Sequence, residues 1–304
     1  MTAGARALAG SGRIPLRIWL MAARPRTLPA AIAPVLVGTA LAGSEGHFRP
    51  LAFAAALVGS VFIQIGTNLS NDYSDARRGA DTEERLGPVR VTAGGLVPPR
   101  KVLVATWLAF GIAVAAGVYL IAIAGWQLLV VGIAAIAAGV LYTGGPRPYG
   151  YEGLGELFVF GFFGIVAVVG SYYVQTEEIR GLAFTLAVPV GLLASAILMV
   201  NNIRDIETDR RAGKRTLAVR LGRHRARRVF AAMVYLPFVW TTVVAIAAGK
   251  PAVLLMWLSF AFAPGLVRTV ASRTDGPSLN RALAQSGRLL AAFSVLVSAG
   301  LLLS

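Results

Sequence analysis

Two clusters of acidic and amide side chains hold most of the chemistry that this sequence offers. Eight of the 14 acidic residues lie in two short segments, each of which follows a long apolar run. The first segment contributes Asn68, Asn71, Asp72, Asp75 and Asp81. The second segment contributes Asn201, Asn202, Asp205, Glu207 and Asp209. Oxygen ligands gathered in this way are typical of sites for hard cations.

The spacing within each cluster places several of these side chains on one helix face. If the apolar runs continue as helices, residues four apart are neighbours, so Asn71 aligns with Asp75, and Asn201 aligns with Asp205 and Asp209. Stacked carboxylates repel one another, and a cation relieves this cost. Mg²⁺ usually takes one or two carboxylates and completes its shell with water and phosphate oxygens. We therefore expect the two faces to meet around Mg²⁺ and a diphosphate.

A less specific explanation is that each cluster is a polar helix end with local salt bridges to nearby arginines. A polar helix end can account for one such cluster, but it accounts less well for two similar clusters in the same chain. A carboxylate at membrane depth is itself an indication of function. On the functional interpretation, Asp75→Ala or Asp209→Ala would abolish turnover without unfolding the protein, because the apolar runs do not depend on these side chains.

Basic residues beside the clusters are candidates for binding phosphate oxygens. The candidates are Arg85, Arg90, Arg147, Lys214 and Arg215. Arg90 and Lys214 are favoured, because the pair at 94–95 and Gly213 are glycines that mark turns able to fold inward. The other basic residues serve equally well as topology determinants or lipid headgroup contacts.

Membrane-spanning helices are the elements that must position these residues. The chain is 56% hydrophobic and only 14% charged, so its apolar surface needs a solvent other than water. Nine apolar runs each approach the roughly 20 residues that cross a bilayer as helix. They cover residues 27–43, 51–70, 102–124, 126–143, 154–174, 182–200, 229–248, 251–271 and 283–303. We expect an all-α membrane protein with one domain over 1–304, in which nine transmembrane helices surround a central cavity that opens to the cytoplasmic side.

The basic residues predict the orientation of this bundle. Nine alternating crossings place 26 of the 29 Lys and Arg residues on one side and only Arg49, Arg180 and Lys250 on the other. Short cytoplasmic loops retain Lys and Arg, so the N-terminal segment 1–26 and the loops 71–101 and 201–228 are expected in the cytoplasm. Nucleic-acid binding is disfavoured, because topology explains most of the net charge of +15. The lack of cysteine excludes disulfides and thiolate metal sites.

Three windows give the sequence a resemblance to a known family. They are Asn71-Asp72-Tyr73-Ser74-Asp75 continued by residues 79–88, Leu141-Tyr142-Thr143-Gly144-Gly145-Pro146, and Asn201-Asn202-Ile203-Arg204-Asp205-Ile206-Glu207-Thr208-Asp209-Arg210. These windows resemble the UbiA superfamily of intramembrane prenyltransferases, and within it the branch that acts on 1,4-dihydroxy-2-naphthoate. The superfamily commonly has a third acid where this chain has Gly79, and Asp81 is expected to substitute for it.

The resemblance implies roles for individual residues. The ligands of Mg²⁺ and diphosphate would be Asn71, Asp75, Asp81, Asp205 and Asp209. The catalytic set would be Asp75, Asp205, Asp209 and Tyr142. Further candidates for the site are Asn68, Asn201, Asn202 and Asp72, the last as an additional metal ligand. The ring of Tyr142 would stabilise an allylic cation. The alternative for Tyr142 is a place in the interfacial belt of aromatic residues.

The implied reaction joins a polyprenyl chain from polyprenyl diphosphate to 1,4-dihydroxy-2-naphthoate, with loss of CO₂ and diphosphate, giving demethylmenaquinone for menaquinone biosynthesis. The expected location is the bacterial plasma membrane (the cell inner membrane), as a multi-pass protein in the lipid bilayer, and a homo-oligomer is left open. Other acceptors are open alternatives, namely hydroxybenzoate, homogentisate or a porphyrin-type ring. A cation transporter is a further alternative, although transporters place their ligands near the midplane and these clusters lie at helix ends.

Overall fold

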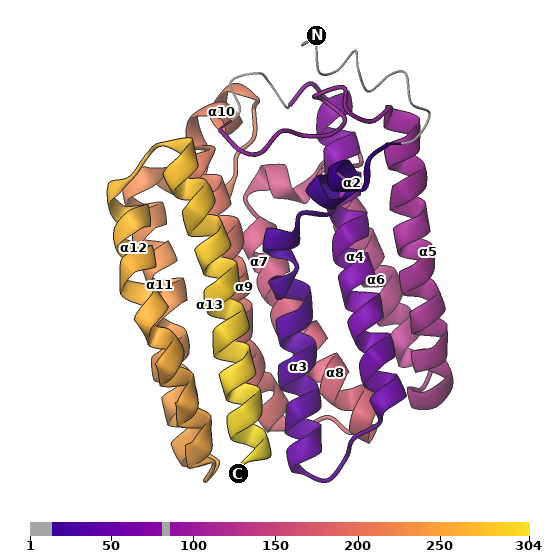
Figure 1. Cartoon of the computed structure of the whole chain (residues 1–304), viewed down its shortest axis with the longest axis vertical. Coiled ribbons are helices and arrows are strands. Elements are labelled where there is room, and N and C mark those ends of the chain that lie inside the picture. Colours follow the sequence, from indigo (N-terminus) through magenta and orange to yellow (C-terminus); the bar gives the residue numbers. More distant parts are fainter. Residues whose placement is uncertain (1–13, 81–85) are drawn as a thin grey trace.

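The computed structural model describes residues 14–80 and 86–304, and within these residues it contains helices and no strands. Long helices run side by side along the long axis of the molecule (Figure 1). The longer ones are α3 (Pro29–Ser44), α4 (Pro50–Arg77), α5 (Pro99–Ala124), α6 (Gln127–Leu141), α9 (Gly181–Arg204), α11 (Leu217–Ala247) and α13 (Gly276–Leu302). The prediction of an all-α chain is confirmed for the described residues.

Shorter helical segments complete the bundle. A π-helical turn, η3 (Phe160–Val166), joins α7 (Gly155–Val159) to α8 (Ala167–Thr176), and a 3₁₀ segment, η4 (Pro251–Phe262), leads into α12 (Ala263–Ser272). The remaining segments are α2 (Leu16–Ala23), η1 (Pro25–Thr27), η2 (Tyr149–Glu152) and α10 (Ile206–Arg211). A π-helical turn inside a helix often marks a functional site.

Proline sets the start of several helices. Pro29, Pro50, Pro99 and Pro251 each lie in the first turn of α3, α4, α5 and η4 respectively. In that turn the N–H that proline lacks has no intrahelical partner, and the fixed φ angle of proline suits the helix. The helices therefore begin close to the residues where the apolar runs begin.

Seven helices of the described residues are long and apolar enough to cross a membrane, and there are eight if a bent pair counts as one span. The bent pair is Leu16–Thr27 with Pro29–Ser44, and the bend is 53°. The predicted run 126–143 falls on α6, which has 15 residues. At 1.5 Å per residue α6 is about 22 Å long, less than the roughly 30 Å of a hydrocarbon core. Each predicted run therefore lies on a helix, whereas the number of crossings stays a prediction.

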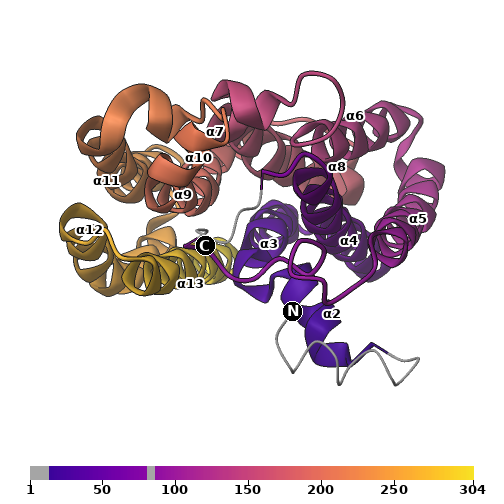
Figure 2. The same cartoon turned by 90° about the horizontal axis from the view of Figure 1, so that it is seen from above.

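Helix α9 lies at the centre of the largest core cluster. It packs against α11 and α13, and α3 packs between α8 and α13, as the view from above shows (Figure 2). A Cβ built on Gly164 would lie 2.7 Å from the Cα of Gly191, so η3 and α9 approach each other backbone to backbone. This close contact holds the α7–α8 segment against the helix that carries the second acidic cluster.

The two ends of the bundle differ in charge. The C-terminal ends of α4 and α9 lie at the same end of the bundle as α10 (Figure 1). The three basic residues predicted to lie on the other side gather at the opposite end, around the end of α3. There Arg49 pairs with Glu177 at 2.8 Å, Arg180 pairs with Glu45 at 3.3 Å, and Lys250 Nζ lies 3.4 Å from Ser44 Oγ.

Candidate active site

A cavity of about 450 Å³ lies inside the bundle and receives side chains from both acidic clusters. Asn71 and Asp75 of α4 line it on one side. Asn201, Asp205 and Asp209 line it on the other, from the end of α9 and from α10. The tertiary structure therefore brings together two clusters that are separated by four helices along the chain.

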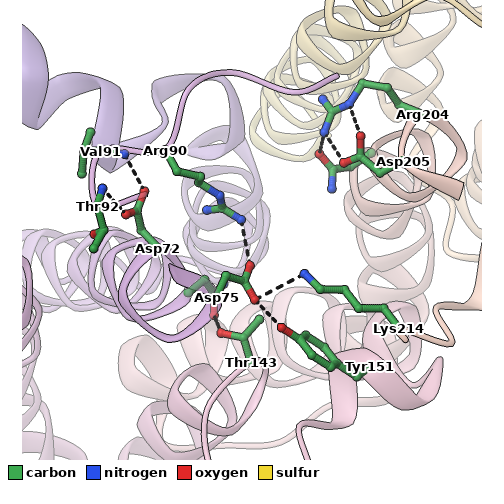
Figure 3. Close-up of polar contacts among 12 residues, drawn as sticks. Asp72, Asp75, Arg90, Val91, Thr92, Thr143, Tyr151, Arg204, Asp205 and Lys214 are labelled. Atoms are coloured by element: carbon green, nitrogen blue, oxygen red, sulfur yellow. Dashed lines mark hydrogen bonds and ion pairs between the residues drawn. The ribbon is translucent and has the colours of Figure 1, made fainter. Parts of the chain in front are cut away.

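Asp75 has several partners, and its side chain is almost fully buried. Arg90 Nη2 lies 3.2 Å from its Oδ2, and Lys214 Nζ lies 3.3 Å from its Oδ1. The Tyr151 hydroxyl donates a 2.6 Å hydrogen bond to the same Oδ1. Figure 3 shows these three groups converging on Asp75 from different parts of the chain. Two buried cations and a phenol thus fix the orientation of one carboxylate.

Arg90 reaches the cavity because Asp72 shapes the loop that carries it. The Asp72 carboxylate accepts hydrogen bonds from the backbone N–H groups of Val91 (3.0 Å) and Thr92 (2.8 Å) (Figure 3). Gly95 closes this turn with φ of +67°, a conformation that glycine adopts without steric cost. Asp72 was a candidate metal ligand, but its carboxylate faces the loop, and the residue does not line the cavity.

Lys214 enters from the other half of the molecule after a turn at Gly213. The φ of Gly213 is +73°, and the Lys214 N–H donates to the carbonyl of Asp209 at 2.8 Å. The ammonium then lies 4.6 Å from the ring centroid of Tyr151, within range of a cation–π contact. Both glycine-marked turns predicted from the sequence therefore fold their basic residues inward.

The residues of the second cluster share one face as predicted, since Asn201, Asp205 and Asp209 all line the cavity, although the helix that carries them is interrupted. Helix α9 ends at Arg204, and Asp205 has φ −95° and ψ 9° before α10 begins at Ile206. The Asp209 N–H still donates to the Asp205 carbonyl at 2.8 Å, which keeps the two residues one turn apart. At the break, the Asp205 carboxylate accepts bonds from Arg204 Nε (2.8 Å) and Nη2 (2.5 Å).

Tyr142 lines the cavity and packs its ring edge-to-face against Tyr149, with centroids 5.4 Å apart. The Tyr149 hydroxyl donates to the Ala138 carbonyl at 2.9 Å, and burial raises the pKa of this phenol, which keeps it neutral. Next to Tyr142, the Thr143 hydroxyl donates to Asn71 Oδ1 at 2.9 Å. The segment after α6 therefore supplies an aromatic wall and orients Asn71.

The other amide candidates also line the cavity, each with a defined partner. Asn68 Nδ2 donates to the Ala23 carbonyl at 3.0 Å, and Asn201 Oδ1 accepts from Arg204 at 2.8 Å. Asn202 Nδ2 donates to Glu156 Oε1 at 2.9 Å. These contacts tie the polar end of the cavity to the surrounding helices.

Besides Asp72, two further predicted residues do not line the cavity. Arg147 and Arg215 are exposed and do not line it, because the loops that carry them turn their side chains outward. Asp81 and Arg85 lie outside the described residues, so their predicted roles stay predictions.

Two residues that the sequence interpretation missed contribute to the site. Glu156 is buried, and a lone acid at the start of an apolar run was a signal that could have singled it out. Tyr151 gave no such signal, because nothing in its local pattern separates it from the neighbouring tyrosines.

The rest of the cavity is mostly apolar. Its lining continues along α4, α5, α6 and the α7–α8 segment, with side chains such as Ile63, Val114, Leu129, Ile136 and Phe162. The cavity therefore combines a polar end with a long apolar wall, which suits an amphiphilic ligand with a charged head and a hydrocarbon tail.

The donor set of the polar end fits Mg²⁺ shared with a phosphate ligand. Within the described part of the chain, no three His, Cys, Asp or Glu side chains lie close enough to hold a metal by themselves. Mg²⁺ does not require such a cage, since it usually takes one or two carboxylates and adds substrate phosphates and water. Asp75 on one wall, and Asp205 and Asp209 on the other, offer that kind of partial oxygen shell.

Comparison with known proteins agrees with this geometry. The sequence pattern of the UbiA prenyltransferase family matches residues 31–301 of the chain. The 1,4-dihydroxy-2-naphthoate octaprenyltransferase of Mycobacterium leprae is 40% identical over 289 residues, which cover 94% of this chain and 96% of that protein. The protein of the same name from Escherichia coli is 42% identical over 221 residues, covering 71% and 72%. A solved UbiA homologue from Archaeoglobus fulgidus, bound to GPP and Mg²⁺, shares the fold with a TM-score of 0.62 at 14% identity, covering 92% of this chain and 99% of that one.

Proposed function

Because the chain belongs to the UbiA prenyltransferase family and is a multi-pass membrane protein, we propose that it transfers a polyprenyl chain from polyprenyl diphosphate to 1,4-dihydroxy-2-naphthoate. The observation that carries this proposal is that Asp75, Arg90, Lys214 and Asp209 line the polar end of one cavity, whose remaining wall is mostly apolar. A diphosphate and its hydrocarbon tail fit such a cavity together. The names of the two bacterial relatives support the choice of acceptor.

Arg90 and Lys214 would bind the diphosphate as it leaves. Both side chains are buried at the polar end, where charge-assisted hydrogen bonds to phosphate oxygens are strong. Asn71, Asp75, Asp205 and Asp209 would hold Mg²⁺ beside them, and the ion would neutralise charge that develops on the leaving group. The allylic C–O bond then breaks with its electron pair on the diphosphate, leaving an allylic cation.

The aromatic wall would receive this cation. Tyr142 lines the cavity, and the face of its aromatic ring attracts a cation. A neutral phenol is a weak nucleophile, so the ring would stabilise the cation without reacting with it. The acceptor carbon that bears the carboxylate attacks the cation, and CO₂ leaves so that its bonding electrons restore the aromatic ring. The loop that Asp72 holds brings Arg90 to the polar end, where it would limit access of water that would otherwise quench the cation.

The orientation in the membrane belongs to the same proposal. We place nine crossings in a bacterial plasma membrane, with the N-terminus in the cytoplasm and the cavity opening on the cytoplasmic side. The positive-inside rule supports this, because nine alternating crossings leave only Arg49, Arg180 and Lys250 on the non-cytoplasmic side. Reporter fusions test it, since nine crossings put the two termini on opposite sides. Termini on the same side would refute that number.

Acceptor competition tests the reaction. Purified protein is given labelled polyprenyl diphosphate, Mg²⁺ and an equimolar mixture of naphthoate, hydroxybenzoate and homogentisate acceptors. We expect transfer to the naphthoate with release of CO₂, and loss of transfer when EDTA removes the metal. Transfer only to another acceptor would refute the substrate assignment, and cation flux in liposomes without transfer would favour a transporter.

A matched pair of variants tests the site. Asp75→Asn keeps the shape of a side chain that lines the cavity, whereas Glu207→Gln alters an exposed acid of the second cluster that pairs with Arg210. We expect the first to lose turnover and the second to keep it. Equal activity in both would remove Asp75 from the proposed mechanism.

A further inference from the structure

Arg204 is a buried arginine behind the cavity wall that the proposed mechanism does not use. It is 2% exposed and does not itself line the cavity. Its Nε and Nη2 bind both carboxylate oxygens of Asp205, and Nη2 also donates to Asn201 Oδ1 at 2.8 Å. Figure 3 shows the guanidinium lying against Asp205. Both of these partners do line the cavity, so Arg204 contacts two site residues from behind.

The geometry of this contact restricts the side chains that it joins. A planar guanidinium that binds a carboxylate through two parallel N–H bonds fixes the carboxylate plane as well as its position. A buried cation is tolerated only when it is paired, so the arrangement is expensive to disturb. The Asp205 carboxylate therefore has little rotational freedom relative to α9.

A second contact, partly buried, extends this network to α13. Arg204 Nη1 donates to Asn280 Oδ1 at 2.5 Å, and Asn280 Nδ2 donates to the Leu86 carbonyl at 3.1 Å. The orientation of the Asn280 amide is determined on both sides, since a guanidinium only donates and a carbonyl only accepts. Asn280 thus connects the end of α9 to the segment that leads to Arg90.

Leu86 docks on α13 at one further point. A Cβ built on Gly276 would lie 2.9 Å from the Leu86 carbonyl oxygen, a distance that a side chain could not occupy. The first turn of α13 therefore leaves room for the Leu86 backbone, and Asn280 one turn later binds it. The Leu86 carbonyl therefore lies close to α13 and accepts a hydrogen bond from it.

We propose that Arg204 and Asn280 are positioning residues for the prenyl transfer reaction. Arg204 orients Asp205 and Asn201 toward the cavity, and Asn280 keeps this pair in register with the Leu86–Arg90 segment on the opposite wall. This inference rests on the proposed function, because it assigns Asp205 to metal binding. Neither residue lines the cavity.

Two variants separate the two parts of the network. Arg204→Lys keeps the charge and loses the two-pronged contact with Asp205. Asn280→Asp keeps an oxygen that accepts from Arg204 and loses the donor to Leu86. Arg210→Lys is the matched control. It makes the same change of side chain on α10, at an exposed arginine that pairs with the exposed Glu207. Melting temperatures in detergent show whether each variant folds.

Two readouts that do not depend on turnover test the proposal. The first is Mn²⁺ binding, measured by electron paramagnetic resonance with an unreactive prenyl thiodiphosphate, and the second is the rate of tryptic cleavage after Arg90 in the intact protein. We expect Arg204→Lys to weaken Mn²⁺ binding at least tenfold. We expect Asn280→Asp to bind Mn²⁺ within threefold of the unmodified protein and to be cleaved after Arg90 at least fivefold faster.

Unchanged Mn²⁺ binding in folded Arg204→Lys would overturn the positioning role of Arg204, and unchanged cleavage in Asn280→Asp would overturn that of Asn280. An effect of equal size in Arg210→Lys would attribute the change to charge near the membrane surface and would also overturn the proposal. If the variants behave as expected but the unmodified protein prenylates another acceptor, the substrate assignment fails while the positioning roles stand.

Discussion

The hydrogen bond from Tyr151 to Asp75 offers the sharpest test of how the site is organised. Tyr151→Phe removes a 2.6 Å bond to a buried carboxylate and keeps the ring that lies 4.6 Å from the Lys214 ammonium. A hydrogen bond to a charged group is worth about 1.5–3 kcal/mol. If all of this energy orients Asp75 for the reaction, kcat/KM falls roughly 10- to 150-fold. Tyr151→Leu, which also loses the cation–π contact, should fall further.

A double-mutant cycle with Asp75→Asn shows whether Tyr151 acts through Asp75. Residues that act as a unit are non-additive, so Tyr151→Phe should have little further effect once Asp75 is already Asn. The assay is the initial rate of labelled prenyl transfer at several concentrations of polyprenyl diphosphate. An equal fold-loss in both backgrounds would mean that Tyr151 acts independently, and it would refute our explanation of the contact.

Three further predictions concern other parts of the molecule. Gly164→Ala should lower the melting temperature by an amount equivalent to about 1–3 kcal/mol, because the new Cβ would meet the backbone of α9, whereas Gly161→Ala, with open space around it, should not. Lys214→Gln should raise the KM for polyprenyl diphosphate about tenfold or more while leaving the acceptor KM unchanged, and the opposite pattern would exclude a phosphate contact. Asp275 caps α13 by accepting from the Ser278 N–H, which lowers the pKa of its carboxyl group. This cap should stabilise the protein above the unfolded pKa of about 3.9 and should weaken as pH falls through the lower folded pKa, so Asp275→Asn should flatten the pH dependence of the melting temperature between about pH 3 and 5.

The structure also changes one expectation about unfolding. The sequence suggests that the spans fold without the Asp75 side chain, but Asp75 is the shared partner of two buried cations. Breaking a buried ion pair by removing one partner costs about 3–5 kcal/mol. Asp75→Ala would therefore combine a loss of stability with a loss of function, which is why Asp75→Asn is the better probe.

The helical class and the two clusters were readable from the sequence because each depends on local properties. A run of about 20 apolar residues has few stable forms other than a membrane-spanning helix, since lipid cannot satisfy the backbone polar groups. Acids and amides four apart at the end of such a run, as at Asn71 and Asp75, lie on one helix face whatever surrounds them. Glycines at turns likewise predicted that Arg90 and Lys214 point inward.

The partners of each charged group were decided by the tertiary structure alone. The contacts of Asp75 with Tyr151 and Lys214, and of Arg204 with Asn280, join residues 76 to 139 positions apart, and local spacing carries no information about such pairs. The break of α9 at Asp205 was equally hidden, because either a straight or a broken helix fits the same four-residue spacing. The sequence determined which charged groups follow the apolar runs. Packing of α9, α13 and the segment after Leu86 determined which of them face the cavity, because a buried charge lies where a partner can neutralise it.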